Sequence, residues 1–171
     1  MDSATLEAAR SGDRSAKGRL LGELQHVWFR FCLGLLRDEH LAADATQETG
    51  LRFLRQLSQF RGESELKTWS LGIALNVVRE TRRKRPPPID AAIDSVAEHP
   101  QAALEADETK SQLHAALSEL SDRQREAVVL RFFEELSVDE TAAAMNCATG
   151  TVKATVHQAL RILKTKLRQS T

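Results

Sequence analysis

The chain has 171 residues, no net formal charge, 42% hydrophobic residues and 28% charged residues. This balance is typical of a globular protein rather than a disordered one, and the length allows one domain or two small ones with buried cores. Because glycine and proline are scarce while Ala, Leu, Arg and Glu are plentiful, the composition predicts an all-helical fold and argues against a sheet.

The first half of the chain predicts four helices. We expect a short helix at residues 4–10, a long one from about 14 to 37, a third from 41 to about 58 and a fourth from about 65 to 83. Apolar residues recur at helical spacing in the second and fourth, which predicts one buried face on each. These apolar positions are Leu20, Leu21, Leu24, Val27, Trp28, Phe31 and Leu35 in the second helix, and Leu66, Trp69, Ile73 and Val77 in the fourth.

Three successive prolines at residues 86–88 mark a domain boundary, because they cannot continue a helix. Helical periodicity resumes near Ala102. The sequence therefore predicts two small helical domains, at residues 1–85 and 102–171, joined by a flexible, acidic and proline-containing linker at residues 86–101.

Charge follows the same division of the chain. Residues 1–85 hold fifteen Lys and Arg against eleven Asp and Glu, residues 86–122 hold one against eight, and residues 123–171 hold eight against five. Two basic ends joined by an acidic middle suggest two nucleic-acid-facing domains and a linker that repels or mimics DNA. An ordinary solvated linker explains the middle segment equally well.

The last third contains two capping boxes, in which Ser121 precedes Gln124 and Ser137 precedes Glu140 by three residues. Helices should begin directly after each serine, with the second ending near residues 145–147 and a third opening at residue 149. A short middle helix between a cap and a tight turn indicates a helix-turn-helix, although a plain three-helix bundle is the alternative. The third helix has one apolar stripe, expected to be buried, of Val152, Val156, Ala159, Leu160, Leu163 and Leu167.

Two sets of motifs then carry a resemblance to a known family. Residues 41–85 contain the patterns D-x-x-Q-E-T, F-x-G-x-S, T-W and I-A-x-N followed by a basic end. Residues 121–163 contain SDRQREAVVLRFFEELSVDETAAAM and GTVKATVHQALRIL. In this order they resemble regions 2 and 4 of the extracytoplasmic-function sigma factors of the sigma-70 family, over about residues 14 to 168. The resemblance implies an alternative RNA polymerase sigma factor that directs promoter-specific transcription initiation.

The resemblance also implies which residues meet each partner. Region 2 would bind the clamp helices of the largest subunit of core RNA polymerase through Asp44, Gln47, Glu48 and Arg52. It would hold the melted −10 promoter element through Phe60, Arg61, Ser64, Lys67, Asn76, Arg79, Arg82, Arg83, Lys84 and Arg85. Region 4 would read the −35 element in the major groove through Thr151, Lys153, Thr155, His157, Gln158 and Arg161. An anti-sigma factor that covers both domains is a further implied partner.

Several positions depart from the family pattern. Gly50 stands inside a helix where a bulky apolar residue is usual, and Ser70 and Gly72 replace larger residues after Trp69. Thr155 and Gln158 stand where family members commonly carry arginine. These departures bear on the strength of promoter melting and on base preference rather than on the fold.

Two alternatives to a sigma factor remain. One is a helix-turn-helix repressor or activator that acts without polymerase and would normally dimerise to read a palindrome, although we find no extra dimerisation helix. The other is a sigma-like adaptor that binds a protein partner. We expect no enzyme activity, metal or cofactor, because the five histidines are scattered and no glycine-rich phosphate loop is present.

Location and redox state follow from weaker signals. No apolar run approaches the ~18–20 residues of a membrane span, and the first residues do not resemble a signal peptide, so we expect a cytoplasmic protein without a membrane span. Cys32 and Cys147 have no zinc spacing and suit a reducing compartment. We expect Cys32 to be buried in the core and Cys147 to lie in a turn.

Overall fold

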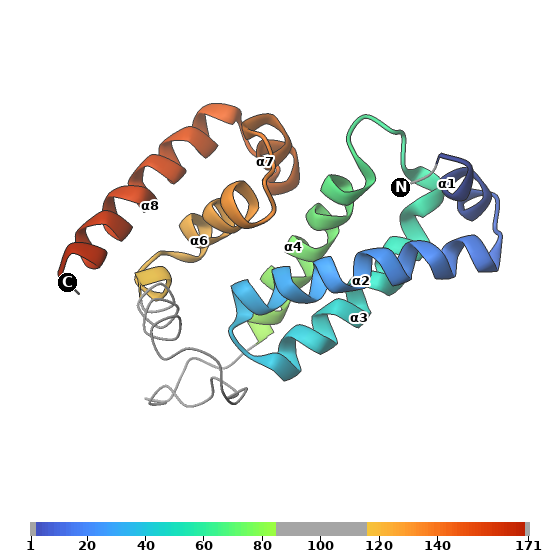
Figure 1. Cartoon of the computed structure of the whole chain (residues 1–171), viewed down its shortest axis with the longest axis horizontal. Helices are drawn as coiled ribbons and strands as arrows, with labels where there is room; N and C mark the ends of the chain where they lie inside the picture. The colour runs from blue at the N-terminus through green and yellow to red at the C-terminus, as the bar shows by residue number, and fades with distance from the viewer. Residues whose placement is uncertain (1–2, 85–115, 170–171) are drawn as a thin grey trace, which may run out of the picture.

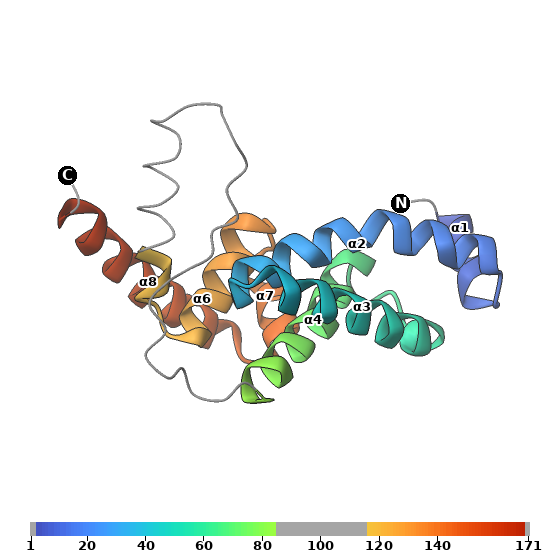
Figure 2. The ribbon, with the colours of Figure 1, turned by 90° about the horizontal axis from the view of Figure 1, so that it is seen from below.

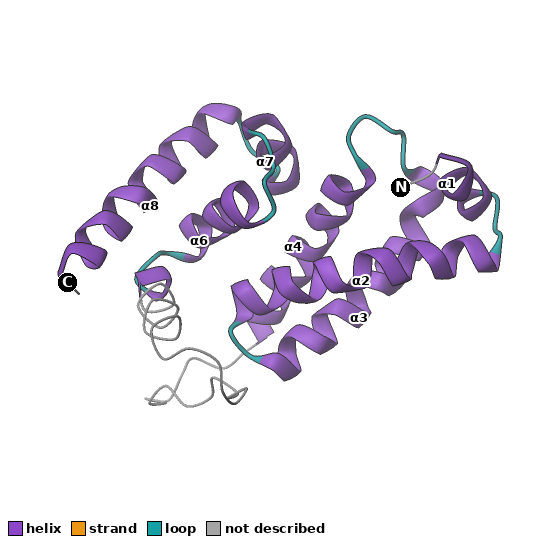
Figure 3. Cartoon of the chain, in the orientation of Figure 1, coloured by secondary structure: helices purple, strands orange, loops and turns teal. Residues whose placement is uncertain are grey.

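The computed structural model describes residues 3–84 and 116–169, and within these ranges every element is a helix or a helical turn (Figures 1 and 3). The N-terminal unit consists of α1 (Ser3–Arg10), α2 (Arg14–Leu36), α3 (Glu39–Gln56) with a 3₁₀ turn (Leu57–Gln59), and α4 (Leu66–Lys84). The C-terminal unit described consists of α6 (Asp122–Val128), a π-helical turn (Val129–Phe133), α7 (Val138–Met145) and α8 (Thr149–Gln169). The all-helical fold expected from the sequence is confirmed.

Capping residues set the helix boundaries. Both predicted capping boxes are present, so α6 and α7 begin directly after Ser121 and Ser137. The carboxylate of Asp38 accepts a hydrogen bond of 2.9 Å from the backbone N–H of Leu41, which satisfies a donor that a helix start would otherwise leave unpaired. Helix α3 therefore begins at Glu39, two residues before the predicted start at residue 41.

The core of the N-terminal unit is built around aromatic rings. Trp28 packs on Phe53 with 5.2 Å between ring centroids, and Phe53 packs on Trp69 at 5.7 Å. The indole N–H of Trp28 donates to the buried hydroxyl of Ser70 at 2.9 Å, and a buried indole needs such a partner. The small residue at position 70 is thus explained by this hydrogen bond. Cys32 is fully buried, as predicted.

The two units pack directly against each other. Helix α4 contacts α7, and α2 contacts α6; Figures 1 and 2 show the two units side by side. Buried side chains of the C-terminal unit join the same hydrophobic core as α2 and α4, namely Ala127, Val129, Leu130, Leu136 and Met145. A separate small core holds α8 against α6. The predicted boundary at residue 85, the linker at 86–101 and the helix start near residue 102 lie outside the described residues.

The predicted stripe of α8 is only partly buried. Val152, Ala159 and Leu163 are buried, whereas Leu160 and Leu167 are 44% and 39% exposed. At about 100° per residue, Leu160 and Leu167 lie about 60–80° around the helix from the line through Val152. Within the described residues, α6 and α7 cover a narrower face of α8 than the apolar pattern suggested.

None of the helices in the described part of the chain combines the length and the apolar character needed to cross a membrane.

Candidate nucleic-acid interface

The outer face of α8 carries the residues predicted to read DNA. Asn146 adopts a left-handed conformation (φ 51°) at the end of α7, and this tight turn sets the direction of α8. Because Val152 and Ala159 are buried against the rest of the unit, the opposite face points to solvent at the edge of the molecule (Figure 1). Five of the six predicted residues are exposed, and Thr155 is half-buried; the exposed ones are Thr151, Lys153, His157, Gln158 and Arg161.

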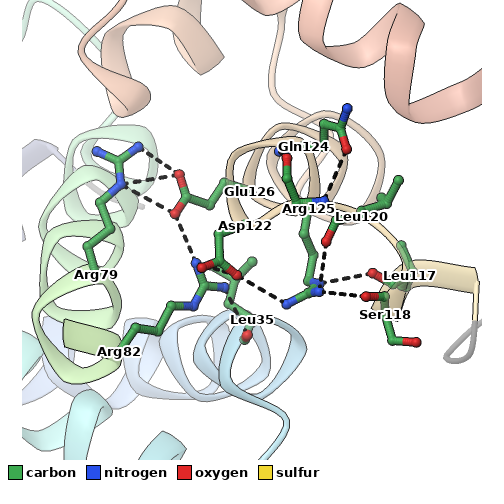
Figure 4. A network of polar contacts seen from close by, with 11 residues as sticks. Leu35, Arg79, Arg82, Leu117, Ser118, Leu120, Asp122, Gln124, Arg125 and Glu126 are labelled. Carbon is green, nitrogen blue, oxygen red and sulfur yellow. Dashed lines mark hydrogen bonds and ion pairs between the residues drawn. The ribbon is translucent and has the colours of Figure 1, made fainter. Parts of the chain in front are cut away.

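At the C-terminal end of α4, two of the predicted −10 contacts converge on one buried carboxylate (Figure 4). Arg79 Nη2 lies 2.7 Å from Glu126 Oε2, and Arg82 Nη1 lies 3.0 Å from Glu126 Oε1. Arg82 Nη2 also donates to the backbone oxygen of Leu35 at 2.9 Å. Only 4% of the Glu126 side chain is exposed. The cations are therefore engaged by the C-terminal unit.

The remaining basic residues of this end differ in their surroundings. Arg83 and Lys84 are exposed in the last turn of α4, and Asn76 is exposed about two turns earlier. Arg85 lies outside the described residues. Of the predicted −10 contacts on the second half of α4, these three side chains are open to a nucleic acid in this conformation.

At the N-terminal end of α4, a cation is again paired with a carboxylate of the C-terminal unit. Lys67 Nζ lies 3.1 Å from Glu134 Oε2 and also donates to the backbone oxygen of Glu134 at 3.1 Å. The Thr68 hydroxyl donates to Glu140 Oε1 at 3.1 Å. Hydrogen bonds from Ser137, and then from Thr68, lower the pKa of the Glu140 carboxyl, which keeps it charged. A carboxylate of the C-terminal unit thus faces α4 at each end.

The loop before α4 lines a hollow beside α1 and α2. Phe60 is only 5% exposed and packs on Trp69 with 5.1 Å between ring centroids, so its ring is largely held by the protein rather than offered to a base. Arg61 is exposed, and Ser64 is half-buried. The hollow is lined by Ser3, Leu6, Glu23, Leu24, Val27, Phe60, Gly62, Ser64, Glu65, Leu66 and Lys67.

The predicted polymerase-binding residues on α3 divide into two pairs. Asp44 and Gln47 are exposed. Arg52 instead lies between two carboxylates, with Nε 2.7 Å from Glu48 and its two terminal nitrogens 2.7 and 2.8 Å from Glu80. The guanidinium lowers the pKa of the Glu80 carboxyl. Arg52 therefore ties α3 to α4, and its bidentate geometry suits that purpose.

Three carboxylates that organise this surface were not predicted from the sequence, namely Glu80, Glu126 and Glu134. Each pairs with a cation on another helix, and no spacing rule within one helix identifies such a pair. One signal was available for Glu126, since it directly precedes the apolar run at residues 127–130. A charged residue adjoining a buried run is seldom buried without a partner.

The chain resembles characterised sigma factors at the level of sequence. Residues 20–86 match the family model described as Sigma-70 region 2, and residues 110–163 match that described as Sigma-70, region 4. The chain is 30% identical to the RNA polymerase sigma-H factor of Pseudomonas aeruginosa, over 92% of this chain and 89% of that protein. It is also 30% identical to the ECF RNA polymerase sigma factor SigM of Bacillus subtilis, over 80% of this chain and 85% of that protein.

Solved structures show the same likeness. A co-crystal structure of the sigma factor RpoE with the anti-sigma factor NepR from Bartonella quintana matches with a TM-score of 0.73 at 29% identity. That match covers 88% of this chain and 96% of the other. The structure of CnrH in complex with the cytosolic domain of CnrY matches in fold, with a TM-score of 0.72 at 20% identity.

Proposed function

Because this chain belongs to the extracytoplasmic-function sigma factors of the sigma-70 family, we propose which of its surfaces meet polymerase and promoter. As a family member it is an alternative RNA polymerase sigma factor that acts in transcription initiation. The observation that carries the assignment of surfaces is the exposed polar face of α8, set on a helix-turn-helix in the position of region 4.

Helix α8 reads the −35 element. Its exposed polar side chains near the N-terminal half can reach base edges in the major groove, while Lys153 and Arg161 contact phosphates. Thr155 and Gln158, which stand where arginine is common in the family, contribute hydrogen bonds without charge. We therefore expect a smaller salt dependence of −35 binding than an arginine-rich helix would give.

The loop at residues 60–64 and helix α4 hold the melted −10 element. A base removed from the stack needs a pocket with polar edges, and the hollow beside Ser64 and Lys67 has apolar walls and such a rim. The exposed side chains of Arg61, Asn76, Arg83 and Lys84 bind the strand, largely through phosphates. Arg79 and Arg82, in contrast, are paired with Glu126. Phe60 supports the wall of this hollow by packing on Trp69.

Polymerase docks on α3 through its exposed polar side chains. Asp44 and Gln47 contact the clamp helices directly, and Glu48 adds charge beside them. Arg52 acts by positioning Glu48 and by joining α3 to α4, since its nitrogens are bonded to both carboxylates. All bond-making chemistry belongs to the polymerase. Because the polymerase transcribes the chromosome, the sigma factor acts in the cytoplasm.

An anti-sigma factor is a further partner. The Bartonella quintana structure pairs the sigma factor RpoE with the anti-sigma factor NepR, and the similarity of this chain supports a partner of the same kind. Such a protein would compete with polymerase and promoter for both helical units.

Reconstituted transcription tests the proposal. Purified chain is mixed with bacterial core RNA polymerase and assayed for initiation on fragments of its own upstream DNA. We expect specific transcripts that are lost on Asp44→Lys, because a cation would oppose the clamp surface. Glu7→Lys on α1, where the side chain is 74% exposed and lies outside the hollow, should leave them. Lys153→Ala with Arg161→Ala should reduce initiation while leaving polymerase binding unchanged.

The same experiment separates the alternatives. Binding of DNA as a dimer, without any binding of polymerase, would identify a repressor or activator. Binding of neither polymerase nor promoter would instead identify an adaptor. For an adaptor, neutralising the basic residues should have little effect.

A further inference from the structure

The first half of α8 presents a small residue near the centre of its exposed face. Val152 and Ala159 are buried against the rest of the C-terminal unit. At about 100° per residue, Ala154 lies about 160° around the helix from Val152, and Gln158 lies about 120° from it. Both are exposed, and α8 forms an edge of the molecule (Figure 1). A duplex that receives this face of α8 therefore meets a methyl group with an amide beside it.

The side chain of Gln158 is available to a ligand. Within residues 3–84 and 116–169, it makes no hydrogen bond or ion pair. Ala154 stands four residues earlier, so the two side chains are neighbours on the surface of the helix. Because only a methyl group separates the backbone of α8 from a duplex at Ala154, the helix can lie deep in the major groove. The longer side chain of Gln158 then reaches the edge of a base.

The amide of Gln158 matches adenine better than guanine. In the major groove, adenine presents the acceptor N7 and the donor N6 amino group, whereas guanine presents two acceptors, N7 and O6. The Nε2 group of Gln158 can donate to adenine N7 while Oε1 accepts from the N6 amino group. On guanine, Oε1 would face O6, and two acceptors repel each other.

Ala154 favours a thymine beside that adenine. Thymine carries a methyl group on its major-groove edge, and an alanine side chain can contact it. The contact removes apolar surface of both groups from water. Cytosine has no such methyl group. Because Ala154 forms no hydrogen bond to the base, we expect its preference to be weaker than that of Gln158.

We propose that Gln158 and Ala154 make this sigma factor select two adjacent A·T base pairs in its −35 element. Gln158 pairs with the adenine of one, and Ala154 contacts the thymine methyl group of the next. Lys153 and Arg161 hold phosphates, which carry no base information. The inference rests on the proposed function, because that function places α8 in the major groove. Both side chains are exposed in the described conformation, so the free chain reads the same base pairs.

Selection from random duplexes measures the preference directly. The full chain is mixed with duplexes that contain about twelve random base pairs, slightly more than one helical turn, and the bound molecules are sequenced. We expect adenine to be enriched over guanine roughly tenfold at one position, as a good bidentate pair discriminates. Thymine should be enriched less strongly at an adjacent position.

Substitutions assign each position to its side chain. Gln158→Arg should switch the preferred base from adenine to guanine, because a guanidinium group donates to both N7 and O6. Gln158→Ala should remove the preference at that position and retain the neighbouring thymine. Ala154→Ser, which places a hydroxyl group at the same point, should weaken the thymine preference alone.

Two further variants serve as controls. Gln25→Arg on α2 adds the same charge at an exposed glutamine outside the hollow, and it should leave the selected sequence unchanged. Lys153→Ala should weaken binding to all duplexes alike and reduce the slope of log affinity against log salt concentration by about one. Circular dichroism confirms that each variant remains helical.

Reconstituted transcription tests the same base pairs with polymerase present. On an active upstream fragment, replacing the selected adenine by guanine should reduce initiation roughly tenfold, and Gln158→Arg should restore it. Initiation that Gln158→Arg does not redirect would overturn the inference while the proposed function stands. Selection of the adenine by the free chain, without any binding of polymerase, would refute the proposed function while the base preference stands. The absence of any selected sequence, or a selected sequence that Gln158→Arg leaves unchanged, would also overturn the inference.

Discussion

Gly50 lies buried in the middle of α3, where a glycine costs about 1 kcal/mol relative to alanine. A Cβ atom built there would lie 3.6 Å from Leu21 Cδ2 and 3.6 Å from Trp28 Cζ3. These are ordinary contact distances, so a methyl group fits but a longer side chain would displace the indole. The close approach of α2 therefore explains why this position holds a glycine and not the bulky apolar residue that is usual in the family.

Gly50→Ala should therefore stabilise the protein by about 0.5–1 kcal/mol, since the gain in helix propensity exceeds any repacking around one methyl group. Urea unfolding followed by tryptophan fluorescence measures the change. Gly50→Leu should destabilise it in the same assay, and a loss of stability in the alanine variant would show that the site has no room for Cβ.

The two cysteines should differ sharply in reactivity. Burial raises the pKa of the Cys32 thiol to about 12, so only about one molecule in ten thousand carries the thiolate at pH 8. Cys147 is half-buried in the turn before α8. A thiol-reactive chromogenic reagent at pH 8 should therefore modify one cysteine per native chain and two in denaturant. Cys147→Ser should abolish the native reaction, and modification of Cys32 in that variant would contradict its burial.

At the scale of helices, Arg52 connects α3 and α4 through Glu80. The partner arginine lowers the pKa of the Glu80 carboxyl below its usual value of about 4.3. The stabilisation is therefore fully present above that usual value and is lost as the pH falls through the lower, folded-state value. Because both side chains are partly exposed, we expect the pair to contribute only about 1 kcal/mol.

The test compares wild type with Glu80→Gln by chemical unfolding at pH 7 and near pH 3. We expect the variant to be less stable by about 1 kcal/mol at pH 7, with the difference shrinking on acidification. Glu63→Gln serves as the control, because Glu63 is exposed and lies 3.9 Å from Arg61. An equal difference at both pH values would assign the effect to packing rather than to charge.

At the scale of the whole molecule, the shared core should couple the stability of the two units. Leu130 lies in the C-terminal unit, is fully buried and belongs to the same core as α2 and α4. Both tryptophans, Trp28 and Trp69, lie in the N-terminal unit. Their fluorescence therefore reports whether a change in one unit reaches the other.

Leu130→Ala should lower the free energy of unfolding measured by tryptophan fluorescence. Truncations of this kind in a core typically cost about 2–5 kcal/mol. Leu163→Ala offers the matched comparison, because Leu163 lies in the separate core under α8, and it should shift this transition less. If neither variant moved the tryptophan signal, the two units would unfold independently.

Helix positions were predictable because their signals are local. Capping serines and 3.6-residue periodicity act within a few residues, so α6 and α7 begin where the sequence places them. The outer face of α8 was predictable for the same reason, since Val152 and Ala159 fix which side is buried. The apolar pattern failed at Leu160 and Leu167, whose exposure depends on how far neighbouring helices extend.

The sequence by itself determined the helices, their order, the buried faces of α2 and α4 and the motifs that place the chain among sigma factors. Only the tertiary structure decided which charges meet. Glu126 and Glu134 lie 47 and 67 residues from Arg79 and Lys67, and no periodicity within one element encodes such a pairing. The physical reason is that an ion pair between elements depends on helix packing, which sums many weak contacts over the whole chain.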